Sequence, residues 1–275
     1  MVYDYKEIEK FGAETFDWYK GMLLKERLLL GNILELFLEA VKPLEESSKD
    51  TDYRKLALLT LATRLFNDCE GASYVLLRGL PAQSQMIIRD IIECIMLFRL
   101  FLNNAKLAKR WIMGLAEFQA GDVNDKLLRI GVNAREYAFY SIFSHEGHAN
   151  FLASIENVQE EEVEEGMRRT FHFGSSRLPS TMFFVQHNFL DLFFLLHLLF
   201  IEPLSEYYSK HSDADVYMVW ANKVDKLTPQ IEALAAEASM RRIGGKPEVD
   251  KQIMEIIEKK FRLWKFKKIL SGDNN

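Results

Sequence analysis

The chain has few of the residues that interrupt regular structure and few of those that cross-link chains or bind metals. Its 275 residues include 14 glycines, six prolines, six histidines and two cysteines. Two cysteines exclude a disulfide scaffold, and neither lies in a Cys-x-x-Cys or Cys/His spacing typical of zinc. Cys69 and Cys94 each lie in an apolar stretch, which predicts buried, reduced thiols in a cytoplasmic protein.

A strong charge of one sign is also missing. The formal net charge is −5, so no overall field draws the protein to nucleic acid or to a membrane surface. The sequence contains no P-loop, no dinucleotide fingerprint and no G-x-S-x-G motif, and we expect no cofactor. Its first residues are polar and acidic, unlike a secretory signal.

What the chain does contain predicts helix. Hydrophobic residues make up 48% and charged residues 27%, with few helix breakers. We predict one all-α domain, a multi-helix bundle with a central antiparallel hairpin. It comprises an N-terminal helical extension (1–50), a core bundle (51–211) and C-terminal helices (212–275). The expected helices are 14–42, 53–78, 81–104, 105–114, 115–130, a helix through Ser144 that Asn133 caps, 181–211, 213–242 and 247–270.

Two segments need separate interpretation. Residues 183–201 are long and apolar enough to cross a bilayer. They also carry His187 and Asp191, and an aspartate near the centre costs about 3 kcal/mol on insertion. We therefore predict a buried core helix and no integral membrane insertion.

Residues 156–180 look irregular, with a weak strand-like or loop character at 167–176.

A polar stripe interrupts the apolar central hairpin. Gln85, Arg89 and Glu93 follow an i, i+4, i+8 spacing, so they share one helix face. Arg64 and Asp68 belong to a looser stripe on the preceding helix, and a tight Gly-Leu-Pro turn at 79–81 would bring the stripes together. Two interpretations are open: a buried ion network that fixes helix register, or a charged pocket between helices.

Ser144 and His148 have i, i+4 spacing on a later helix, and we expect their face to meet the face of Arg89 and Glu93. An arginine, a carboxylate, a serine and a histidine could hold an anion and move a proton. Arg89, Glu93, Ser144 and His148 are therefore the candidate catalytic residues. Their ligand would be an anionic small molecule or RNA. The alternative is a histidine that is hydrogen-bonded in the core.

These residues carry a family resemblance. The chain shows R-x-x-x-E at Arg89, A-x-R-W ending at Arg110 and Trp111, and Y-x-x-x-S-x-x-x-H beginning at Tyr140. Over about residues 55–200 it resembles an uncharacterised all-helical bacterial family, a domain of unknown function. The resemblance implies a helical fold and bacterial origin, and no established activity.

A more distant likeness is to HEPN-type helical ribonucleases, whose hallmark is R-x(4–6)-H on one helix. Arg168 and His172 are one residue too close for that pattern. An HEPN-like ribonuclease is therefore an alternative from which this chain departs.

Three further expectations remain. His187 and Asp191 could join His145 or His148 around a metal, although a hydrogen bond in the core is the default and we predict no metal site. The basic, aromatic stretch 259–268 could contact nucleic acid or an anionic membrane, or could be a packing helix. The long helices at 14–42 and 247–270 could instead make the protein a non-catalytic interaction or oligomerisation module, a homo-oligomer.

Overall fold

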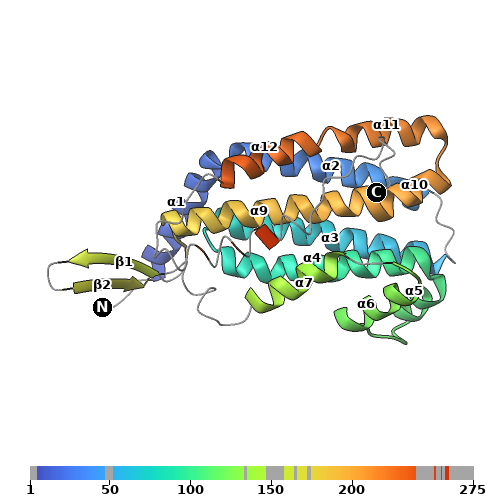
Figure 1. Ribbon diagram of the computed structural model, residues 1–275, viewed down its shortest axis with the longest axis horizontal. Helices are drawn as coiled ribbons and strands as arrows, with labels where there is room; N and C mark the ends of the chain where they lie inside the picture. The colour runs from blue at the N-terminus through green and yellow to red at the C-terminus, as the bar shows by residue number, and fades with distance from the viewer. Residues whose placement is uncertain are drawn as a thin grey trace.

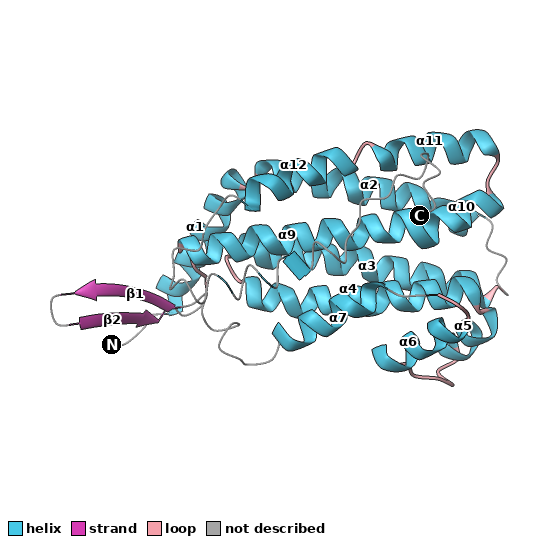
Figure 2. Cartoon of the chain, in the orientation of Figure 1, coloured by secondary structure: helices cyan, strands magenta, loops and turns pink. Residues whose placement is uncertain are grey.

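The all-α prediction is confirmed: the chain folds as a bundle of packed helices, with one short antiparallel hairpin (Figures 1 and 2). The computed structural model describes residues 5–46, 52–132, 135–146, 158–163, 166–171 and 175–239, with Lys251, Glu255, Glu258 and Lys259. The predicted helix at 247–270 and the basic stretch 259–268 therefore lie almost entirely outside the described residues.

The elements are as follows in chain order. The first half contains α1 (Tyr5–Met22), α2 (Leu24–Glu46), α3 (Tyr53–Leu77), α4 (Pro81–Asn103), α5 (Ala105–Ile112), α6 (Ala120–Arg129) and α7 (Arg135–Glu146). The hairpin is β1 (Val158–Val163) and β2 (Gly166–Phe171). The second half contains α9 (Pro179–Leu199), the π-helical segment η1 (Phe200–Leu204), α10 (Ser205–His211), α11 (Ala214–Asp225) and α12 (Thr228–Ser239).

Local chemistry explains most helix boundaries. Asp52 caps α3 by accepting hydrogen bonds from the backbone N–H groups of Arg54 and Lys55. Asn104 caps α5 in the same way, and Asp213 caps α11. Pro81 opens α4, where its missing N–H costs nothing. The central hairpin of α3 and α4 therefore begins and ends close to where its sequence predicts.

The predicted helix at 14–42 was wrong in both limits. It is two helices, α1 and α2, and α2 continues through Pro43 to Glu46. Proline removes the N–H that would bond the carbonyl of Glu39, four residues earlier. The hydroxyl of Tyr208 donates to that carbonyl instead, at 3.1 Å. Burial raises the pKa of Tyr208 to about 12, so the phenol keeps the proton that it donates.

The segment predicted to be irregular contains the β-hairpin. Its register places Glu160 opposite Arg169 and Glu161 opposite Arg168. Arg168 therefore lies on strand β2, in keeping with the strand-like alternative for residues 167–176.

The core is continuous from α1 to α12 and is centred on α9 (Figure 1). The stretch Ser180–His211 is long and apolar enough to cross a membrane, and its most apolar window is 89% buried in the bundle, as its sequence predicts. Two of its side-chain amides donate hydrogen bonds to neighbouring elements: Gln186 to Glu26 and Asn188 to the Pro81 carbonyl. The predicted N-terminal extension shares this core, because α2 packs against α3 and α9.

The turn between α3 and α4 requires glycine. Gly79 has φ +68°, and a Cβ there would lie 2.3 Å from the backbone oxygen of Ser176. The turn is thus pressed against the segment that leads into α9.

We predict that Gly79→Ala is strongly destabilising. Left-handed strain costs roughly 1–2 kcal/mol and the clash with Ser176 about the same again. Gly114→Ala is the matched control, because Gly114 has φ +67° and open space around it. Urea denaturation measures the free energy of unfolding of both variants. Gly114→Ala should lose stability through backbone strain alone, and Gly79→Ala through strain and the clash with Ser176. Equal losses of unfolding free energy would contradict a tight contact at Gly79.

Candidate functional site

The structure brings the two polar stripes of the hairpin together through Asp90. Arg64 on α3 lies 3.8 Å from Asp90 on α4, and 3.5 Å from Asp68 on its own helix. Asp90 is one residue beyond the predicted face of Gln85, Arg89 and Glu93. The contact between the helices therefore lies at the edge of that face.

Arg89 connects α4 to α7. Its Nη2 donates to the hydroxyl of Tyr140 at 2.7 Å, and its guanidinium carbon lies 5.0 Å from the centroid of the same ring. Its Nε lies 3.7 Å from Glu93. Tyr137 stacks on Tyr140 with a centroid distance of 6.0 Å. These contacts hold the α7 helix against α4.

Arg89 and Glu93 are less buried than the sequence predicts. The side chains of Arg89 and Glu93 are 39% and 31% exposed, so water carries part of their solvation. Ser144 lies on α7 one turn beyond Tyr140, but its side chain is outside the description. His148 lies outside the described residues. The convergence of Ser144 and His148 with Arg89 and Glu93 therefore stays a prediction.

The charges around Arg89 do not form a positive site. Two arginines, Arg64 and Arg89, stand among three carboxylates, Asp68, Asp90 and Glu93. Each arginine already lies within 4 Å of a carboxylate. A phosphate would have to compete with these carboxylates, which weighs against strong anion binding here.

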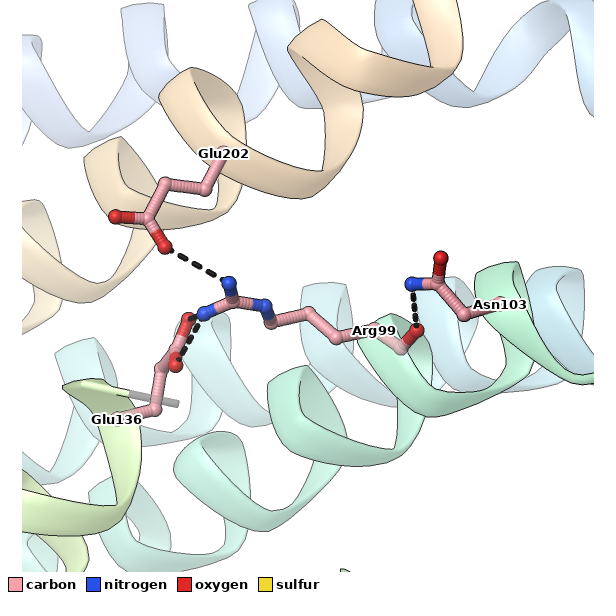
Figure 3. A network of polar contacts seen from close by, with 4 residues as sticks. All are labelled: Arg99, Asn103, Glu136 and Glu202. Carbon is pink, nitrogen blue, oxygen red and sulfur yellow. Dashed lines mark hydrogen bonds and ion pairs between the residues drawn. The ribbon is translucent and has the colours of Figure 1, made fainter. Parts of the chain in front are cut away.

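The buried ionic centre lies about three turns beyond Arg89 along α4, at Arg99, which is not among the residues predicted from the sequence. Arg99 donates from Nη1 to both oxygens of Glu136 at 2.7 and 2.6 Å (Figure 3). Its Nη2 lies 2.9 Å from Glu202. The three residues come from α4, α7 and η1, so one guanidinium holds three elements that are far apart in the sequence.

The surroundings of this triad are apolar. Glu136 has no solvent-exposed side-chain surface and Arg99 retains 9%. Burial raises the pKa of the Glu136 carboxyl, and the nearby Arg99 charge opposes that shift. Arg99 also interrupts the buried run from Cys94 to Phe101, which is the signal that could have identified it.

Glu202 reaches the triad from a distorted helix. η1 has π-helical geometry and contains Pro203, which cannot donate to the ordinary helical ladder. The wider turn of a π-helix changes the direction in which side chains leave the helix, and such turns occur frequently at functional sites. The triad therefore acts as a clamp between helices, in which Arg99 pairs with the buried Glu136 and with Glu202, whose side chain is 18% exposed.

We predict that Arg99→Met costs about 3–5 kcal/mol, because it leaves two carboxylates in the core without their cation. Arg89→Met, which cuts a half-exposed pair, should cost about 1 kcal/mol or less. Urea denaturation followed by circular dichroism measures both free energies of unfolding. Similar losses in the two variants would show that Arg99 is not the dominant clamp.

A second buried polar contact joins α9 to α12. His197 Nε2 lies 3.0 Å from the hydroxyl of Thr228, and burial lowers the pKa of His197 to about 4. His187, proposed as a possible ligand, instead has its Nδ1 2.8 Å from the Phe183 carbonyl oxygen. Among the described residues, no group of three or more histidine, cysteine, aspartate or glutamate side chains is placed to hold a metal.

His197 predicts a stability that depends on pH. The unfolded histidine takes up its proton near pH 6.5, whereas the folded one resists until about pH 4. Stability should therefore fall as pH drops from 6.5 to 4, by up to about 3 kcal/mol from this residue. Unfolding free energies across this range should show a smaller slope in His197→Gln. The exposed His211→Gln is the control, and a wild-type slope in His197→Gln would refute the assignment.

One groove of about 680 Å³ lies on the outside of the bundle, between α2 and the pair α11 and α12. Leu36, Val41 and Leu227 form its buried floor. Glu35 and Glu39 line it from α2, and Lys223 lines it from α11, where it pairs with Glu39 at 2.6 Å. This groove is well separated in the sequence from the polar stripe around Arg89.

The outer face of α2 beside this groove exposes large apolar side chains. Leu24, Leu28 and Leu38 are 54%, 61% and 49% exposed, while the opposite face of α2 is buried in the core. A helix that is apolar on both faces has more apolar surface than one core can cover.

Comparison of the chain with protein-family models, with curated proteins and with solved structures gives no match.

Proposed function

We propose that the protein is a non-catalytic interaction module that associates with a second copy of itself through the outer face of α2. The observation that carries this proposal is the exposure of Leu24, Leu28 and Leu38 along one side of that helix. A surface apolar patch of this kind is typical of an association site. We propose that it works in the cytoplasm of a bacterium, in keeping with two reduced, buried cysteines.

The ion clusters support this proposal over catalysis. Arg99, Glu136 and Glu202 are bound to one another in the core, and Arg89 is bound to Tyr140 and Glu93. A catalytic group needs to reach a substrate, whereas these groups are occupied with fixing helix positions. Their role is to keep the bundle rigid, which presents α2 in one defined orientation.

A second candidate function is the binding of an anionic ligand or RNA between α4 and α7. The half-exposed Arg89 beside the stacked rings of Tyr137 and Tyr140 favours it, because aromatic rings and arginine together accept nucleobases. The three neighbouring carboxylates count against it. The HEPN-like alternative rests on Arg168, which lies on β2, and on His172, which lies outside the described residues.

We predict that Leu28→Glu weakens self-association by at least about tenfold, because a charge would be buried against the second copy. Leu115→Glu is the control, since Leu115 is 61% exposed, as Leu28 is, but lies far from α2 in the sequence. Sedimentation velocity over a wide concentration range measures the dissociation constants. A wild-type protein that stays monomeric throughout would refute the proposal, as would equal effects of the two variants.

A further inference from the structure

The outer face of α2 has the spacing of a coiled-coil seam. Six of its exposed residues lie along one line of the helix, separated by four, three, four, three and four positions, and the exposed Lys25, Asn32 and Glu39 flank them on one side. The helix face behind them is buried in the core. Such alternating spacing keeps one line of side chains directed at a neighbouring helix. The seam residues are Leu24, Leu28, Gly31, Glu35, Leu38 and Lys42.

We propose that two copies of this chain pair antiparallel along α2, around a two-fold axis that crosses the exposed seam at the height of residue 33, with Leu28 packed against Leu38 of the second copy. This inference rests on the proposed function and adds how the two copies are oriented relative to each other. A two-fold axis at this height brings the leucines together at two symmetric positions, and places Leu24 against the long side chain of Lys42.

Charge decides between the antiparallel and the parallel arrangement. Parallel helices would set Glu35 opposite Glu35 and Lys42 opposite Lys42 in the seam. The antiparallel arrangement places Glu35 opposite Gly31, which has room for it. Like charges facing each other at an interface are costly, so the antiparallel pairing is favoured.

The charges that flank the seam agree with this arrangement. Lys25 pairs with Glu237 of α12 at 3.0 Å, and Glu39 pairs with Lys223 of α11 at 2.6 Å. Both pairs lie on the same side of α2, near opposite ends. An antiparallel partner would bring the Lys25 pair of one copy next to the Glu39 pair of the other, so that positive and negative groups alternate.

Gly31 has no evident role within a single chain. A Cβ at this position would meet nothing within 4 Å, although glycine weakens a helix interior. In the antiparallel pair it lies near the centre of the seam, where its missing side chain leaves room for Glu35 of the second copy.

The groove also fits this partner. It lies between α2 and α11 with α12, which run together along one long side of the bundle (Figure 1). Leu38 and Lys42 line it. Leu24 of the second copy would face this end of the groove and cover part of its apolar floor.

Disulfide cross-linking tests the geometry. The native thiols of Cys69 and Cys94 are buried, so exposed cysteines can be introduced without competition. Leu28→Cys and Leu38→Cys are prepared separately in the full chain, then oxidised alone and as a mixture. We expect a cross-linked dimer in the mixture and in neither variant alone. In the antiparallel pair the two Leu28 positions lie ~15 Å apart along the axis, beyond the reach of a disulfide.

The outcomes separate this inference from the proposed function. Cross-linking of Leu28→Cys with itself would indicate parallel helices and overturn the inference. If the protein sediments as a dimer but no combination of variants forms a cross-link, the chain self-associates, but not through the outer face of α2. A monomer would overturn both. Leu115→Cys mixed with Leu28→Cys is the control for random collision, and a signal equal to that of the 28/38 mixture would also overturn the geometry.

Discussion

The bundle depends on one buried guanidinium. Arg99 is the cation that two carboxylates share, and it connects α4, α7 and the π-helical segment that follows α9. Moving three charges out of water is expensive, and only close, well-oriented hydrogen bonds offset that cost. An arrangement that fails to place all three groups together leaves a charge unpaired in the core. The triad therefore selects one packing of these helices over similar ones that apolar contacts alone would allow.

The parts of the fold that follow from local chemistry could be predicted from the sequence. The α3 and α4 helices have an aspartate cap, a glycine at positive φ and a proline in the first turn, and each signal lies within a few residues of the boundary that it sets. The burial of α9 could be predicted as well, because its polar side chains made a membrane span too costly.

The features that the sequence did not reveal depend on partners far along the chain. Arg99 meets Glu136 and Glu202 from 37 and 103 residues away. The apolar residues around Arg99 indicate a buried charge, but nothing near it in the sequence identifies its two partners. The charges of Arg89 and Glu93 seemed the costly ones because of their apolar neighbours in sequence. In the fold they lie at the rim of the α4–α7 contact, where water reaches them. The spacing of residues in the sequence shows which of them share a helix face, but how deeply that face is buried depends on how all the helices pack.

The hydrogen bond from Tyr208 to the Glu39 carbonyl spans 169 residues of sequence. Pro43 leaves the Glu39 carbonyl of α2 without its internal donor, and α10 supplies the missing donor. During synthesis this carbonyl has no donor from within the chain until α10 has been made. The first and last thirds of the chain are in this sense a single folding unit, and a fragment that ends before α10 would lack the donor that completes the helix at its own beginning.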